Sequence, residues 1–219
     1  MSDWIKHDGL FYKINRSERW LPKQNAKLIA EIGLGKARGK NVIDIGAHSG
    51  TWTMPLAKCG ANVVAVEASF VTFGRLVDGL IKNSLLKTVL PICAAVAVVA
   101  GEIAEVRGSG YGDGTSGLWQ PERQGRLGMT ATVTLDSLAA LVLPSQIDLL
   151  KIDIEGGEHY ILPSVPLSLW RMVDWLALEI HDIQDRPIWH KSGGRNVDLP
   201  SLLDLRGFDR KEVSLWRRR

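Results

Sequence analysis

The sequence lacks the features that mark a secreted, membrane or zinc-binding protein. Its two cysteines, Cys59 and Cys93, are too few for a disulfide framework and show no CxxC or Cys/His zinc spacing. The longest apolar run, Val89 to Ala100, contains a proline and is far shorter than the roughly 20 residues that a membrane span needs. The N-terminus lacks the apolar stretch of a secretory signal. We therefore expect no membrane span and a cytoplasmic protein with reduced thiols.

The chain also lacks a strong charge of either sign. It has 27 basic and 24 acidic residues, a net charge of +3, and three of the basic residues are the terminal Arg217, Arg218 and Arg219. This balance gives no support to binding of nucleic acid through a basic surface. With 219 residues and 45% hydrophobic content, the chain fits one globular domain with a small addition.

Segments of strand and helix character alternate along most of the sequence. Short β-branched runs predict strands, whereas Thr51–Lys58 and Phe70–Leu86 have helical character. The predicted strands are Asn41–Ile45, Asn62–Glu67, Val89–Val99 (one strand or a pair), Thr130–Thr134, Ile147–Ile152 and Val173–Ile180. A further helix is expected over Leu135–Leu143. This alternation predicts an α/β fold with a mostly parallel sheet and helices on both faces.

Two segments fall outside this alternation. We expect residues 1–40 to form an N-terminal extension, with a hairpin around Asp8-Gly9 and a helix near Asn25 to Ile32, and residues 41–219 to form the main domain. The segment Arg107 to Gly128 is rich in glycine, which opposes regular structure. It is either an exposed connection or a mobile lid over the site.

The turn after the first strand of the main domain has nucleoside-binding character. It reads Asp44-Ile45-Gly46-Ala47-His48-Ser49-Gly50, a DxGxxxG pattern in which Gly46 permits a tight turn and Gly50 allows a close ligand approach. Glu67, at the tip of the next strand, is placed to accept hydrogen bonds from two ribose hydroxyls. The GxGxxG dinucleotide fingerprint is missing. The pattern suits a ligand with a ribose and an amino-acid tail but no pyrophosphate.

Five motifs follow one another between residues 41 and 181, with a weaker similarity in Leu199 to Leu215: VIDIGAHSG, VVAVEAS, VTLDSL, IDLLKIDIEGGEHYIL and LALEIH. Together they resemble the FkbM-type S-adenosylmethionine-dependent methyltransferases. The resemblance implies a Rossmann-like class I methyltransferase fold and methyl transfer, commonly to an oxygen of a sugar or another small polar acceptor. The chain ends soon after a strand expected near Asp209 to Trp216, so we expect the last antiparallel strand of such a sheet to be missing or replaced.

The resemblance also implies the residues that bind S-adenosyl-L-methionine. The family's cofactor loop falls on Asp44, Gly46 and Gly50, and its ribose-binding acid on Glu67. We take Ala47, His48 and Ala68, beside these positions, as further cofactor contacts. A KxDxEGxE element falls on Lys151, Asp153, Glu155, Gly156 and Glu158.

Titratable residues at two strand ends are the candidates for catalysis. Lys151 and Asp153 are two apart, as are Glu179 and His181, so each pair shares a face at the carboxyl edge of the sheet. An internal ion pair is the alternative for the first pair, and Glu158 could be a helix cap. His181 could take the proton of an acceptor hydroxyl, oriented by Glu179 or Asp153. Alternatively, Asp153, Glu179 and His181 could hold a divalent cation, although we expect no metal.

Three functions remain open on the sequence. The first is O-methylation of a small-molecule or glycan acceptor, with Lys151, Asp153, Glu179 and His181 as catalytic residues. The second, RNA or nucleotide methylation, needs a basic groove that the composition does not suggest. The third is a non-catalytic nucleoside-binding module. Trp189 and His190, after the last predicted strand, are further candidates for acceptor contact.

Overall fold

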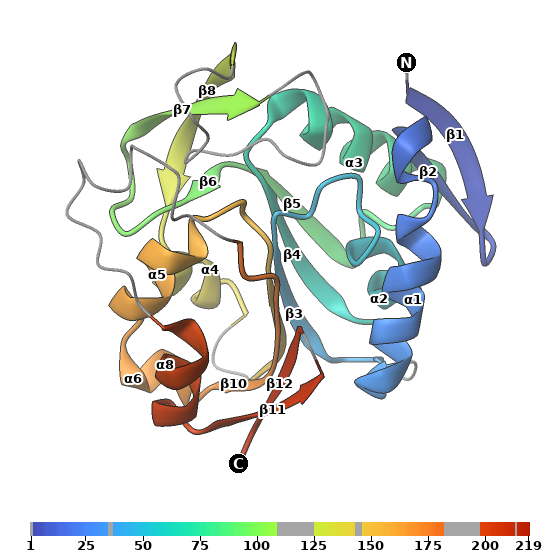
Figure 1. Cartoon of the computed structure of the whole chain (residues 1–219). Coiled ribbons are helices and arrows are strands. Elements are labelled where there is room, and N and C mark those ends of the chain that lie inside the picture. Colours follow the sequence, from blue (N-terminus) through green and yellow to red (C-terminus); the bar gives the residue numbers. More distant parts are fainter. Residues whose placement is uncertain (1, 35–36, 109–124, 143–145, 182–197, 213) are drawn as a thin grey trace.

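The computed structural model describes residues 2–34, 37–108, 125–142, 146–181, 198–212 and 214–219 (Figure 1). The N-terminal elements are β1 (Ser2–His7), β2 (Leu10–Asn15), the 3-10 helix η1 (Arg16–Glu18) and α1 (Leu21–Glu31). The central elements are β3 (Asn41–Ile45), α2 (Thr53–Lys58), β4 (Asn62–Glu67), α3 (Phe70–Lys82), β5 (Val89–Cys93), β6 (Ala95–Val96), β7 (Ile103–Gly108) and β8 (Gly125–Val133). The C-terminal elements are α4 (Leu135–Ala139), β9 (Ile147–Ile152), α5 (Glu158–Ser164), α6 (Leu167–Trp170), β10 (Val173–Leu178), α8 (Leu199–Leu205), β11 (Phe208–Glu212) and β12 (Leu215–Arg218).

A seven-stranded sheet organises the described residues. Its strand order is β11-β12-β10-β9-β3-β4-β5. The neighbours from β10 to β5 pair in parallel, and β12 pairs antiparallel with both β10 and β11. This order confirms the Rossmann-like methyltransferase sheet that the sequence predicts. The expectation of a missing antiparallel strand is wrong, because Leu215–Arg218 inserts between β10 and β11 within the last few residues of the chain.

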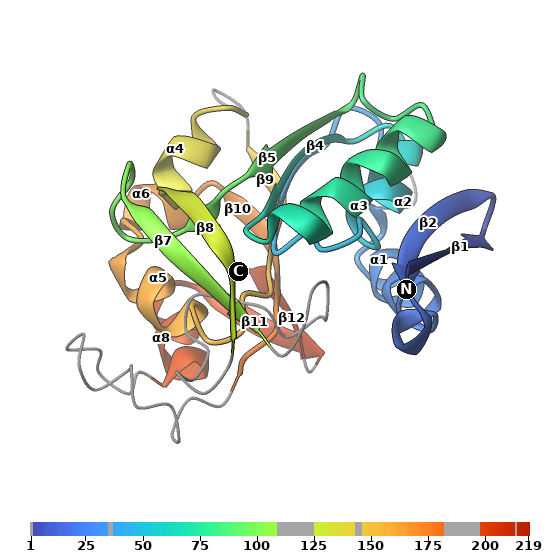
Figure 2. The ribbon, with the colours of Figure 1, turned by 90° about the horizontal axis from the view of Figure 1, so that it is seen from above.

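Helices cover both faces of this sheet, with α1, α2 and α3 on one side and α4, α5, α6 and α8 on the other (Figures 1 and 2). The strands are buried on both sides, as parallel strands between helices must be. In β4, Val63 and Ala65 belong to the core under α1, α2 and α3, whereas Val64 and Val66 belong to the core under α4, α5, α6 and α8. No helix in the described ranges has the length and apolar character to cross a membrane.

The N-terminal hairpin is fastened to α3. The hairpin expected around Asp8-Gly9 is present, with β1 and β2 paired antiparallel from Ser2↔Asn15 to His7↔Leu10. Asn83 closes the end of α3, and its side chain accepts from the Phe11 N–H at 2.9 Å and donates to the Phe11 carbonyl at 2.7 Å. These contacts hold the N-terminal segment against the main sheet's helical layer.

Three local predictions are wrong. The helix expected over Leu135–Leu143 ends at Ala139, with Ala140 at its C-cap. The helix predicted to Leu86 ends at Lys82, because Asn83 takes the C-cap position and Ser84 adopts a left-handed φ of 57°. The segment expected to be irregular from Arg107 is regular at its ends, since β7 and β8 form an antiparallel ladder that includes the pair Gly108↔Gly125. Glycine weakens a strand but does not prevent pairing beside a bulge, and one lies between Val106 and Arg107. The middle of the proposed lid, residues 109–124, lies outside the described residues.

Candidate active site

The loop after β3 is folded tightly against β4. Gly46, His48 and Gly50 all adopt left-handed φ values, of 72°, 52° and 83°. The N–H groups of Gly46 and Ala47 both donate to the Val66 carbonyl at 2.9 Å, and the Gly50 N–H donates back to the Ala47 carbonyl. Because these N–H groups already donate hydrogen bonds to backbone carbonyls, they are not available to bind a phosphate, as the amides of a phosphate-binding loop are. This agrees with a ligand that has no pyrophosphate.

Glu67 is held in place at the end of β4. One carboxylate oxygen accepts the His48 N–H at 2.9 Å and the other accepts the Ser69 N–H at 2.8 Å. Each oxygen keeps a second lone pair for a ligand hydroxyl. Burial raises the pKa of Glu67 above its ordinary value, while the His48 imidazole and the two backbone amides oppose that shift. The side chain is therefore fixed before any ligand arrives.

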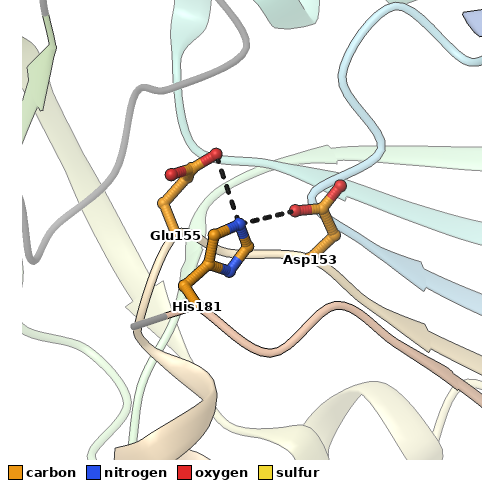
Figure 3. Close-up of side chains that lie close together, drawn as sticks. All are labelled: Asp153, Glu155 and His181. Atoms are coloured by element: carbon orange, nitrogen blue, oxygen red, sulfur yellow. Dashed lines mark ion pairs between the residues drawn. The ribbon is translucent and has the colours of Figure 1, made fainter. Parts of the chain in front are cut away.

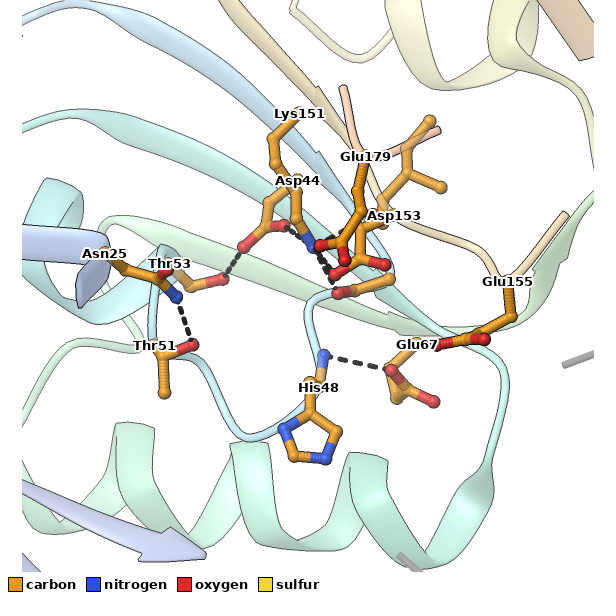
Figure 4. Close-up of polar contacts among 12 residues, drawn as sticks. Asn25, Asp44, His48, Thr51, Thr53, Glu67, Lys151, Asp153, Glu155 and Glu179 are labelled. Carbon is orange, nitrogen blue, oxygen red and sulfur yellow. Dashed lines mark hydrogen bonds and ion pairs between the residues drawn. The ribbon is translucent and has the colours of Figure 1, made fainter. Parts of the chain in front are cut away.

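Asp44, in β3, and Lys151, in the neighbouring strand β9, lie beside the loop after β3 (Figure 4). The Asp44 carboxylate is fully buried and accepts a hydrogen bond of 2.6 Å from the Thr53 hydroxyl. The Lys151 Nζ donates to the Gly46 carbonyl at 2.6 Å and lies 3.4 Å from Asp44 and 3.5 Å from Asp153. Burial alone would lower the pKa of Lys151, but these two carboxylates raise it above its ordinary value. Lys151 is thus a charged link between the loop and Asp153.

A histidine surrounded by carboxylates stands at the ends of β9 and β10 (Figure 3). The His181 Nε2 lies 3.8 Å from Asp153 and 3.6 Å from Glu155, and Glu179 is 3.9 Å away. On the other side, the Nδ1 is 3.0 Å from the fully buried Glu158 carboxylate, which also accepts the His181 backbone N–H at 2.7 Å. The Glu158 carboxylate therefore favours the tautomer with its proton on Nδ1, leaving the Nε2 lone pair toward Asp153 and Glu155.

The electrostatics of this cluster favour a protonated imidazole. Burial lowers the pKa of His181, but the hydrogen bond and charge of Glu158, with Glu155 and Asp153, outweigh it and raise the pKa to about 9. Burial and the charge of Asp153 also raise the pKa of Glu179. Donor atoms of Asp153, Glu155 and His181 lie within 4.8 Å of one another, close enough for one cation.

One cavity of about 520 Å³ lies between the loop after β3 and the ends of β9 and β10. His181, Asp44 and Gly50 are not among the described residues that line it, so the imidazole reaches the cavity only through the carboxylates beside it. Its lining includes Gly46, Ala47, His48, Glu67 and Ala68 on the loop side and Lys151, Asp153, Glu155 and Glu179 at the strand ends, together with residues of η1 and α1. The volume is that of an ordinary small-ligand site. A side chain at Gly46 would place its Cβ 1.8 Å from the Asp153 carbonyl oxygen, so the loop has room only for glycine there. The residues present fit a ligand with a ribose diol and no phosphates.

The structure brings together most of the residues that the sequence singles out, but with different neighbours. Glu158, rather than Glu179 or Asp153, is hydrogen-bonded to His181. In the group of side chains close enough to hold one cation, Glu155 takes the place that the sequence analysis gives to Glu179. The KxDxEGxE spacing was the signal for both acids. Nothing in the sequence indicated that η1 and α1 line the same cavity. Trp189 and His190 lie outside the described residues.

Comparison with known proteins identifies a family for this chain and several solved structures with a similar fold. A family model described as "Methyltransferase FkbM domain" matches residues 44–189. No curated protein matches the chain.

Solved structures with a similar fold include TYW2 of M. jannaschii in complex with AdoMet, at 14% identity and a TM-score of 0.47, covering 98% of this chain and 82% of that one. Magnesium protoporphyrin IX methyltransferase of Synechocystis PCC 6803 also has 14% identity and a TM-score of 0.47, with 90% and 79% covered. The 16S rRNA N2 G1207 methyltransferase of T. thermophilus has 15% identity and a TM-score of 0.47, with 100% and 50% covered. Similarity at this level does not indicate an acceptor for this chain.

Proposed function

Because the chain belongs to the FkbM methyltransferase domain family, we propose that it transfers the methyl group of S-adenosyl-L-methionine to an oxygen of a sugar or another small hydroxylated acceptor. The observation that carries the proposal is the shared cavity. Glu67 and the loop after β3 line one part of it, and Asp153, Glu155 and Glu179 line another. Groups suited to a nucleoside and groups suited to a hydroxyl therefore meet in one space.

The loop side would hold the cofactor. Glu67, fixed by the N–H groups of His48 and Ser69, would accept hydrogen bonds from the ribose hydroxyls. Gly46, Ala47, His48 and Ala68 would contact the remainder of the ligand, whereas the buried Asp44 and Lys151 would support the loop from behind. Asp44 and Lys151 are accordingly positioning residues in this proposal.

The residues at the ends of β9 and β10 would bind the acceptor and take its proton. S-adenosyl-L-methionine supplies an electrophilic methyl group whose bond to sulfur breaks on transfer, with S-adenosylhomocysteine as the leaving group. The protein must therefore hold the acceptor hydroxyl and accept its proton as the new oxygen–carbon bond forms. The His181 Nε2 is the proposed proton acceptor, oriented by Glu158, with Asp153 and Glu179 placed to hold acceptor hydroxyls. Alignment of the acceptor with the methyl group would contribute most of the rate, since the donor is intrinsically reactive.

An acceptor screen tests the proposal directly. The parent protein is incubated with labelled cofactor and with neutral sugars, glycolipids, small phenols or short RNAs, and the products are identified by mass spectrometry. Methylated oxygen on a sugar or phenol is the expected result. Methylation of RNA alone would favour the nucleic-acid alternative, and turnover of no acceptor the non-catalytic module. Tight binding of NAD with none of S-adenosylhomocysteine would contradict the cofactor assignment.

Removing the Glu67 carboxylate should weaken cofactor binding. We expect Glu67→Ala to reduce the affinity for S-adenosylhomocysteine by about 1–3 kcal/mol, because charge-assisted hydrogen bonds to the ribose are lost. Calorimetry measures the effect, and the exposed Glu102→Ala serves as the matched control. Unchanged affinity in a folded Glu67→Ala variant would show that Glu67 only braces the loop.

Chelation separates the two chemical interpretations of the histidine cluster. We expect methyl transfer to continue in excess EDTA, because Lys151 already lies 3.5 Å from Asp153 and its charge opposes a cation there. Product formation is compared in EDTA, in buffer and in added Mn²⁺ or Mg²⁺. Loss of activity in EDTA with recovery on adding metal would instead assign Asp153, Glu155 and His181 as ligands.

A further inference from the structure

Two buried polar contacts tie the N-terminal segment to the cofactor loop. Glu18 of η1 is buried, and its carboxylate lies 3.6 Å from the His48 Nε2. Seven residues further on, the Asn25 side chain in α1 donates to the Thr51 hydroxyl at 2.9 Å (Figure 4). Both N-terminal residues precede the part of the chain that the family model matches, residues 44–189. The backbone between Glu18 and Asn25 is thus held at both ends against the site.

Trp20 lies between these two anchors and remains exposed. It is the residue before the first turn of α1, and 57% of it is accessible to solvent. It nevertheless lines the same cavity as Glu155 and Glu179, together with Leu21 and Gln24. Exposure of the apolar indole surface to water is unfavourable, and here that surface lines a cavity of ligand size. This placement suits contact with a ligand rather than packing.

The charged side chains that line the cavity limit the chemical class of that ligand. Its described lining includes the carboxylates of Glu18, Glu67, Asp153, Glu155 and Glu179. The ammonium group of Lys151 is buried and already engaged by Asp44, Asp153 and the Gly46 carbonyl. A phosphate would be repelled here, whereas hydroxyl groups could donate to the carboxylates.

We propose that Trp20 is a stacking platform for the acceptor, and that the acceptor is an uncharged ring bearing hydroxyls, of the pyranose type. The C–H groups of one ring face would lie on the indole, whose π face is electron-rich, while the hydroxyl edge meets Glu155 and Glu179. This inference rests on the proposed function, since it names the acceptor class for the same cavity.

The test uses the protein saturated with S-adenosylhomocysteine. Methyl glycosides of glucose, galactose, mannose, fucose and rhamnose are titrated by saturation-transfer NMR, next to the corresponding sugar 1-phosphates. We expect at least one neutral glycoside to bind, Trp20→Ala to weaken it about tenfold or more, and Trp20→Phe to retain most of the affinity. Trp4→Ala is the matched control, because Trp4 is 44% exposed but lies on the hairpin strand β1.

The outcomes separate this inference from the proposed function. S-adenosylhomocysteine affinity, measured by calorimetry, should be the same in parent, Trp20→Ala and Trp4→Ala proteins. Equal glycoside binding by parent and Trp20→Ala, tighter binding of the sugar phosphates, or binding of no glycoside would overturn the inference while leaving methyl transfer intact. A loss of S-adenosylhomocysteine affinity in Trp20→Ala would also overturn it, since Trp20 would then contact the cofactor. A parent protein that binds no S-adenosylhomocysteine would contradict the proposed function itself.

Discussion

Gly46→Ala is expected to abolish measurable S-adenosylhomocysteine binding and to lower the free energy of unfolding by several kcal/mol. The added Cβ would lie 1.8 Å from the Asp153 carbonyl oxygen and 2.9 Å from its carbon, and both are backbone atoms. The residue also has a φ of 72°, which L-residues adopt only with strain. The loop after β3 and the segment after β9 would have to separate, so the overlap affects both sides of the cavity.

Gly39→Ala is the matched control for this variant. Gly39 has a similar φ of 76°, but an added Cβ there would meet nothing within 4 Å. It should therefore cost about 1 kcal/mol of backbone strain and leave cofactor affinity unchanged. Calorimetry and urea unfolding of the two variants separate overlap from strain. If Gly46→Ala bound S-adenosylhomocysteine as the parent does, the loop would not be the cofactor cradle.

The parts of the fold that could be predicted from sequence are those fixed by local composition. The run Ile147–Ile152 is a strand with those bounds, because four of its six residues are Ile or Leu and all six positions are buried. The turn at Asp44–Gly50 and the position of Glu67 at a strand tip also follow from local sequence, because both lie within one βαβ unit, β3-α2-β4. The β7–β8 ladder was missed because glycine content, rather than cross-strand pairing, dominates that stretch of sequence.

Which side chains contact one another within the site cannot be predicted from local sequence patterns, because the contacts join residues far apart in the chain. Glu158 and His181 are 23 residues apart, and the hydrogen bond between them follows from the parallel pairing of β9 with β10. The contact of Glu18 with His48 joins a 3-10 helix to a loop of another element. The KxDxEGxE spacing marks Glu158 as a candidate, but a helix cap explains it equally well on sequence, because acids are common in a first helical turn. Its burial and its two bonds to His181 became evident only in three dimensions.

His181→Ala is expected to lower turnover on a confirmed acceptor by about 10²-fold or more while leaving S-adenosylhomocysteine affinity unchanged. The Nε2 faces Asp153, which lines the cavity at the strand ends, whereas Glu67, the proposed ribose-binding residue, lines it at the loop after β3, so the lost interaction is expected to belong to the acceptor. Glu158 keeps its bonds from the backbone N–H groups of Gly156 and residue 181, which preserves the fold. His7→Ala, on the N-terminal hairpin, is the matched control.

The pH profile distinguishes a base from a structural histidine. With a pKa of about 9, the imidazole is protonated at neutral pH, and only the neutral ring can accept a proton. Turnover of the parent should therefore rise as pH increases and level off above about 9. Asp153→Asn removes one carboxylate that stabilises the charged ring, so its profile should level off at a lower pH.

The alanine variant should show a different profile, since it relies on ionisation of the acceptor alone. Its turnover should keep rising above pH 9, so that the ratio of parent to variant is constant below that pH and shrinks above it. Steady-state rates from pH 6 to 11, with unfolding measured at each pH, give both curves. If His181→Ala retained near-parent turnover at neutral pH, the histidine would serve to hold Glu158 in place, and the hydroxyl proton would leave to another group.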